Sequence, residues 1–295
     1  MNRTTHPVPI DLKTAAATER SAFETAEQPG LTLFAIGMIG LGVLALAVGD
    51  FAMVWQPVPP SFPARTALAY ASGLLMMVCG AGLLFRATVK WSVRVLFPYC
   101  IAWASLKIPA LVVAPKIEGV WLGFGELAVL LAGAWTLFAN LGGVDPQGRF
   151  GWLDGDRSVR VARYWLAVWI IPIGLSHLIY AKETYALVPA WMPFRAAWVY
   201  ITGVGQMASG LGLLFGVLPR VAAWAEAIQI SLYTLLIWLP AVVFGGSKDL
   251  SSTFPNAGMR LHWTAFWISW AIASGAWVVA QNVRSPGQKW QSSQG

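Results

Sequence analysis

Charged residues are scarce in this chain of 295 residues. Only 11% are Asp, Glu, Lys or Arg, and 57% are hydrophobic, whereas soluble globular proteins carry roughly 25% charged residues. Cysteine is also rare, since Cys79 and Cys100 are the only two. Both lie in apolar runs outside any C-x-x-C spacing, and thiol exchange needs a paired, activated dithiol. The composition therefore excludes an ordinary soluble domain and disfavours thiol redox chemistry.

Familiar cofactor motifs are missing as well. Nothing in the sequence resembles a haem, iron–sulfur or flavin site. The Gly203-Val-Gly205 segment has no strand before it and no helix start after it, so it is not a dinucleotide-binding motif. Residues 1–29 lack the short apolar core and cleavage site of a signal peptide. We expect 1–29 and 284–295 to be disordered, polar cytoplasmic tails.

Long apolar runs are what the chain does contain. A segment of about 20 apolar residues can cross a hydrocarbon core of about 30 Å. Eight runs are long enough to be transmembrane helices: 31–49, 64–85, 89–113, 117–140, 161–181, 195–217, 219–243 and 260–281. The sequence thus predicts an all-α, polytopic membrane protein whose nearest partners are membrane lipids.

The net charge is +7, and the distribution of the basic residues fits this topology. With the N-terminus inside, the inner segments hold thirteen Lys and Arg residues and the outer segments six. This distribution obeys the positive-inside rule. It places both termini in the cytoplasm and the protein in the inner (plasma) membrane, and it gives no reason to expect a nucleic-acid partner.

Residues 59–85 and 189–215 are two copies of one segment. At a constant offset of 130 they agree at 12 of 27 positions, including Pro, Arg, Tyr and Met as well as Gly and Leu. A shift of 142 aligns Gly133-Ala-Trp135 with Gly275-Ala-Trp277 and Asn140 with Asn282. We therefore expect four-helix bundles at 30–140 and 161–283, joined by a Gly- and Pro-rich cytoplasmic linker at 141–160. An even number of spans per copy makes the repeats parallel.

Ionisable side chains inside membrane spans are costly and are candidates for function. Glu226, Gln229 and Tyr233 recur at spacings of three and four, so they share one face of a helix. The face fits a polar lining for a small ligand or a proton path; equally, Glu226 reaches water or Arg220 near the cytoplasmic side. Lys107 and Glu126, on consecutive antiparallel spans, form a predicted intramembrane ion pair that either fixes helix register or serves as a relay.

Two histidines, His177 and His262, lie at the outer ends of their spans and are candidates for lining one outer mouth. A metal site needs three or four converging ligands, and two histidines without a spacing signature do not predict one. Arg65 and Arg195, at outer span starts, are expected to reach lipid headgroups.

The second half resembles the DoxX-like family. The resemblance rests on His177-Leu-Ile-Tyr180, Val188-Pro-Ala-Trp-Met-Pro193, Trp198-Val-Tyr-Ile-Thr-Gly203, Gly210-Leu-Gly-Leu-Leu214 and Arg220-Val-Ala-Ala-Trp224. The first half is similar only through the repeat, so the chain looks like a tandem fusion of two four-helix units. Relatives usually carry an acid where this chain has Gln206 and, in the first copy, Met76.

What this resemblance implies is a membrane subunit or accessory of a quinone- or sulfur-linked redox system, with quinone as the candidate ligand and a soluble or membrane redox partner. Two alternatives stay open. One is a carrier for a small solute at the seam between the halves, and the other is a scaffold without a ligand. Whether the chain is catalytic is open too. We expect function in the second half, at His177, Gln206, Glu226, Gln229, Tyr233 and His262.

Overall fold

The computed structural model of the chain describes residues 28–245 and 258–283. These residues form helices joined by short loops, and no strand occurs among them. The expected tails at 1–29 and 284–295 fall almost entirely outside the described residues. The helices make eight spans that are long and apolar enough to cross a membrane, as the sequence predicted.

Four spans come from the first half: α2 (Pro29–Val48), α3 (Arg65–Leu83), α4 (Arg86–Ser105) continued by α5 (Ile108–Val113), and α6 (Glu118–Leu141). A short η1 turn (Gly151–Leu153) leads into the second half. Its spans are α7 (Gly155–Ile179), α9 (Arg195–Phe215), α10 (Pro219–Tyr233) continued by η2 (Thr234–Trp238) and α11 (Leu239–Phe244), and α13 (Gly258–Gln281). The short α8 (Ala181–Leu187) connects α7 to α9.

Helix α7 begins earlier than the sequence suggested. Its first residue is Gly155 rather than 161, so the predicted linker 141–160 shrinks to the residues between α6 and α7. Arg157 and Arg160 therefore belong to the helix. Apolarity alone misplaces this boundary because a helix continues past the hydrocarbon, where its charged residues reach water.

Two faces of the molecule are used as landmarks below. The terminal face is where α2 begins and α13 ends, and there the Gly30 N–H donates to Gln281 Oε1 at 3.1 Å. The far face is the opposite one, where α2 ends at Val48 and α3 begins at Arg65.

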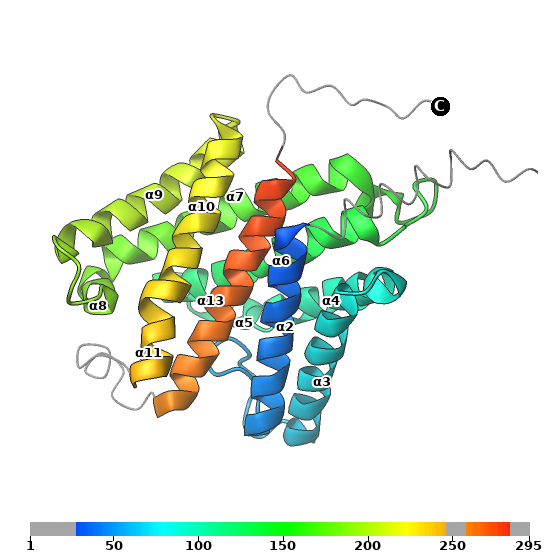
Figure 1. Cartoon of the computed structure of the whole chain (residues 1–295), viewed down its shortest axis with the longest axis horizontal. Coiled ribbons are helices and arrows are strands. Elements are labelled where there is room, and N and C mark those ends of the chain that lie inside the picture. The colour runs from blue at the N-terminus through cyan, green and yellow to red at the C-terminus, as the bar shows by residue number, and fades with distance from the viewer. Residues whose placement is uncertain (1–27, 246–257, 284–295) are drawn as a thin grey trace, which may run out of the picture.

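The spans form a closed ring of neighbours. Each span packs against the next along the chain, and α13 returns to pack against α2. Figure 1 shows α13 lying beside α2, with α3 and α4 on one flank and α8 and α9 on the other. The last span of each half also packs on the first span of the other half, as α6–α7 and α13–α2. The helices of the two halves therefore pack directly against one another and do not form two separate bundles.

Helices α6 and α13 meet at the centre of this ring. At their crossing a Cβ on Gly133 would lie 2.4 Å from Gly275 Cα, so glycine at both positions permits backbone contact. Close backbone approach through small residues is a common way to join helices in a membrane. Near the terminal face the same two helices are joined by Asn140 Nδ2, which donates to Asn282 Oδ1 at 2.9 Å.

Candidate functional site

Three helices of the second half, α7, α9 and α10, bring together a group of polar side chains. We call this group the second-half cluster; it consists of His177, Thr202, Gln206, Glu226, Gln229 and Tyr233. Thr202 and Gln206 are four residues apart on α9, and the last three share one face of α10. Five of the six residues are those that the sequence singled out. Thr202 was missed, because threonine is common in membrane helices and its spacing carries no signal.

Glycine brings α7 and α9 close enough to form the cluster. A Cβ at Gly203 would lie 2.8 Å from the Gly174 carbonyl oxygen and 2.9 Å from His177 Cβ. The two helices therefore touch through their backbones at this level. The contact places His177, near the end of α7, directly against Thr202 on α9.

Thr202 and His177 are in hydrogen-bond contact in the outer part of the cluster. Thr202 Oγ1 donates to the Trp198 carbonyl at 2.7 Å and lies 2.9 Å from His177 Nδ1. When the Thr202 hydroxyl donates to Trp198, the matching tautomer of neutral His177 donates from Nδ1–H to Thr202 and keeps Nε2 as an acceptor.

Gln229 links the two sides of the cluster. Its Nε2 donates to the Thr202 carbonyl at 2.9 Å and to the Tyr233 hydroxyl at 2.8 Å. The carboxamide oxygen Oε1 lies 3.1 Å from where a Cβ on Gly205 would be, so glycine leaves space beside it. The rings of His177 and Tyr233 are 5.6 Å apart. These four side chains, His177, Thr202, Gln229 and Tyr233, are half-buried and form the outer part of the cluster.

The inner part of the cluster is sealed. Gln206 and Glu226 are both 0% exposed, and Gln206 Nε2 donates to Glu226 Oε1 at 3.1 Å. The remaining oxygens, Gln206 Oε1 and Glu226 Oε2, have no hydrogen-bond partner within the described part of the chain. Such groups are expensive to bury.

The α-helix is interrupted immediately after the cluster. Residues Thr234–Trp238 form a π-helical turn, η2, which begins at the residue after Tyr233. Short π-helical segments inside α-helices occur frequently at functional sites. The corresponding span of the first half also breaks at this level, between α4 and α5.

The corresponding place in the first half contains the side chain of Gln56. Gln56, 5% exposed, donates from Nε2 to Tyr99 OH at 2.9 Å and to Ser72 Oγ at 3.4 Å. Its Oε1 accepts the Ala52 N–H at 2.9 Å. Ser72 and Tyr99 correspond to Thr202 and Gln229 at the offset of 130. A side chain from the α2–α3 loop thus takes part in the first-half hydrogen bonds, whereas Gln229 itself makes those of the second half.

His262 does not join the second-half cluster. It is buried in the first turns of α13, and its Nδ1 has no hydrogen-bond partner in the described residues. The mouth expected to be shared by His177 and His262 stays a prediction. The part of the chain that the structure describes holds no group of three or more side chains able to bind a metal ion.

Lys107 and Glu126 lie near each other but do not form a direct ion pair. Lys107 Nζ donates to the Val54 carbonyl at 2.7 Å, and Trp55 Nε1 donates to Glu126 Oε2 at 2.7 Å. The α2–α3 loop therefore separates the two charged groups and binds both. The sequence could not show this, because the loop residues lie more than fifty positions away.

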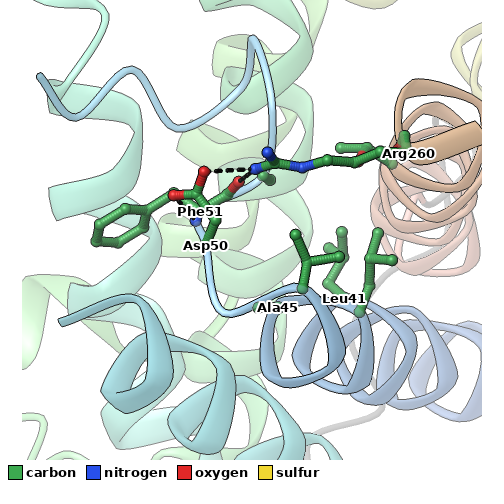
Figure 2. Close-up of a pocket in the computed structure, with 9 residues that line it drawn as sticks. Leu41, Ala45, Asp50, Phe51 and Arg260 are labelled. Atoms are coloured by element: carbon green, nitrogen blue, oxygen red, sulfur yellow. Dashed lines mark hydrogen bonds and ion pairs between the residues drawn. The ribbon is translucent and has the colours of Figure 1, made fainter. Parts of the chain in front are cut away.

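A second polar site, at the far face, was not foreseen. Asp50, just after α2, binds Arg65 at the start of α3, and its Oδ2 accepts a hydrogen bond from Arg260 Nη2 of α13 at 2.7 Å. Arg260 also donates to the Phe51 carbonyl at 3.0 Å. Figure 2 shows Arg260 reaching across Ala45 and Leu41 toward this loop. The cavity beside them measures about 10 Å³, close to the space of one water molecule.

Asp50 is held as a carboxylate. Partial burial opposes its ionisation, but hydrogen bonds from Arg260, from the Phe51 N–H and from Arg65 outweigh that effect and hold its pKa below the ordinary value of 3.8. The arginine expected to reach lipid headgroups in the first half is thus engaged within the protein. Its counterpart Arg195 donates to the Val188 and Tyr185 carbonyls.

Comparison with family models gives a match to part of the second half. Residues 166–280 match the model of a family described as a domain of unknown function (DUF8561), and this stretch contains the whole second-half cluster. Neither the curated proteins nor the solved structures contain a match.

Proposed function

We propose that the chain is a DoxX-like membrane protein that binds a lipophilic molecule with a polar ring, a quinone in the first place, in its second half. It would act as a membrane subunit or accessory of a quinone- or sulfur-linked redox system. The observation that carries this proposal is the half-buried outer part of the second-half cluster. There His177, Thr202, Gln229 and Tyr233 gather polar groups at a depth where lipid would otherwise demand apolar ones.

The chemistry of these groups suits a carbonyl- and hydroxyl-bearing ring. His177 Nε2 and Gln229 Oε1 are acceptors, the Tyr233 hydroxyl can donate or accept, and the two rings of His177 and Tyr233 supply flat surfaces 5.6 Å apart. Pockets for small lipophilic molecules typically combine apolar walls with a few polar groups that fix orientation. The neighbouring π-helical turn gives the wall a local irregularity of the kind found at binding sites.

The proposal includes two parallel repeats related by an axis between α6 and α13. Equivalent positions make equivalent contacts: Arg65 Nε and Arg195 Nε donate to the carbonyls of Val58 and Val188, each seven residues earlier. The residues before α3 and α9, Ala64 and Phe194, both have positive φ, at 52° and 54°. At the centre, Gly133 meets Gly275 and Asn140 meets Asn282. The surplus of basic residues at the terminal face supports the further proposal that this face is cytoplasmic and that the membrane is the inner membrane.

Binding of decylubiquinone, a short-chain quinone, tests the proposal. The purified protein contains 17 Trp, so bound quinone should quench their fluorescence in a saturable way. Gln229→Leu should weaken binding about tenfold, as expected for the loss of hydrogen bonding worth about 1.4 kcal/mol. The matched first-half variant Tyr99→Phe should bind like wild type. Quenching that never saturates, or that Tyr99→Phe weakens as much as Gln229→Leu, would refute the proposed site.

A further inference from the structure

The contact between Gln206 and Glu226 has a feature that quinone binding does not use. Each side chain is fully buried and makes one hydrogen bond, from Gln206 Nε2 to Glu226 Oε1. Each also keeps one oxygen without a partner among the described residues, namely Gln206 Oε1 and Glu226 Oε2. Each side chain of the pair therefore has one acceptor oxygen that receives no hydrogen bond from the described part of the chain.

A single proton on Glu226 would give both oxygens a hydrogen-bond partner. An ionised carboxylate only accepts hydrogen bonds, whereas a carboxylic acid carries one O–H donor. A proton on Glu226 Oε2 gives that oxygen a hydrogen to donate, and Gln206 Oε1 is the acceptor left over on the side chain already bonded to Glu226. We infer that Glu226 is an intramembrane proton-binding site, in which the carboxylic acid donates to Gln206 Oε1 while accepting from Gln206 Nε2.

The surroundings of Glu226 favour the neutral form. Its interactions are burial and the Gln206 hydrogen bond, with no charged partner among the described residues. The other ionisable groups on α10 and on the elements packed near it are Arg220 and Tyr233 on α10, Arg195 and Tyr200 on α9, Arg260 and His262 on α13, and His177 on α7, which touches Tyr233. A lone carboxylate inside a membrane protein is costly, so a proton stabilises the site.

Further polar side chains lie on the same face of α10 as Glu226. Glu226 is seven residues into α10, about 10 Å along the helix from its start at the terminal face. Gln229 and Tyr233 follow on that face toward the far face, and the ring of Tyr233 lies 5.6 Å from that of His177 near the end of α7. The step is protonation of a carboxylate, so no electron moves.

The first half contains a natural control for the pair. The positions equivalent to Gln206 and Glu226 at the offset of 130 are Met76 and Leu96, which are buried at 1% and 2% exposure. Both partners are apolar there, as expected if the two groups are useful only together. This inference goes beyond the quinone proposal and does not depend on it, because the proton site needs no ligand.

Infrared spectroscopy of the full-length protein in lipid nanodiscs tests it without any ligand. The spectrum of Glu226→Gln is subtracted from that of wild type at neutral pH. We expect the difference to contain the C=O stretch of a carboxylic acid and no carboxylate band. In Gln206→Met that C=O band should move to higher frequency, because it loses its hydrogen-bond partner.

A difference that contains the carboxylate band would overturn the inference, and so would a C=O band that Gln206→Met leaves in place. If Glu226→Gln fails to fold, the double variant Gln206→Met with Glu226→Leu, patterned on Met76 and Leu96, replaces it in the subtraction. Loss of quinone binding in any of these variants would bear on the quinone site only, so the two proposals fail separately.

Discussion

At the scale of single residues, the ion-pair and hydrogen-bond partners of a carboxyl group decide whether it is charged. Asp50 has two arginine partners and stays charged, whereas Glu226 has only an amide and is more stable neutral. In the first half Gln56 donates to Tyr99 and Ser72, whereas in the second half Gln229 donates to Tyr233 and to the Thr202 carbonyl. Equivalent places in the two halves therefore carry different hydrogen-bond partners.

The Gln206–Glu226 pair should behave as a unit in stability measurements. Gln206→Met or Glu226→Leu alone leaves a buried polar group without its partner, and each should cost about 1–3 kcal/mol of unfolding free energy. The double variant should cost clearly less than the sum, because both polar groups are gone. Unfolding in mixed detergent micelles measures the cycle. Additive losses would show that the two side chains are not coupled.

Asp50 predicts a stability change with pH. Its pKa in the folded protein lies below 3.8, so its carboxylate contributes stability above that value and loses it as the pH falls through the lower, folded pKa. Asp50→Asn should lower the unfolding free energy by about 1 kcal/mol at neutral pH. The difference from wild type should vanish in strong acid.

The matched control for Asp50 is Asp154→Asn, since Asp154 precedes α7 without a side-chain capping bond. Thermal melts at neutral and acidic pH compare the two variants. A loss of stability in Asp50→Asn that persists unchanged in strong acid would contradict the role given to its charge.

At the scale of helices, the sequence predicted the elements better than their contacts. Apolar runs located all eight spans, because length and hydrophobicity alone decide what crosses a membrane. The spacing of Glu226, Gln229 and Tyr233 placed them on one face because helical periodicity is local. The sequence missed Asp50, Gln56 and Thr202, which bind residues 15 to 210 positions away. Contacts between helices depend on packing that no local pattern encodes.

The crossing of α6 and α13 should tolerate no side chain larger than glycine at Gly133. A Cβ there would lie 2.4 Å from Gly275 Cα, so Gly133→Ala forces the two helices apart. Overpacking of this kind costs about 1–3 kcal/mol. Gly119→Ala on the same helix is the control, since its nearest neighbour, Tyr180 OH, lies 3.3 Å away. Equal melting temperatures for the two variants would argue against the crossing.

At the scale of the whole molecule, helices of the two halves pack against one another in a single ring, so neither half is an independent bundle. The contacts α6–α7 and α13–α2 cross the boundary between the halves, and Arg260 of the second half binds Asp50 of the first. The sequence predicts a duplication because residues 59–85 and 189–215 agree at 12 of 27 positions. It does not predict how the two halves are joined, because that depends on contacts between residues up to 251 positions apart.

The orientation of the molecule is predicted by its basic residues. In cells expressing a cysteine-free background (Cys79→Ser, Cys100→Ala), a membrane-impermeant maleimide should label Ser61→Cys at the far face. It should not label Gln147→Cys in the loop at the terminal face until the membrane is opened. Both positions are exposed, so accessibility within the protein does not differ. The reverse labelling pattern would invert the proposed topology.

The central claim is the proposal that the second-half cluster binds a lipophilic ring compound. Mass spectrometry of the lipid extract from protein purified in mild detergent tests it most directly. Wild type should yield one lipophilic ring compound of quinone type per chain, the Gln229→Leu, Tyr233→Phe double variant should lose it, and Tyr99→Phe should keep it. Recovery of phospholipid alone from the wild-type protein would contradict the claim.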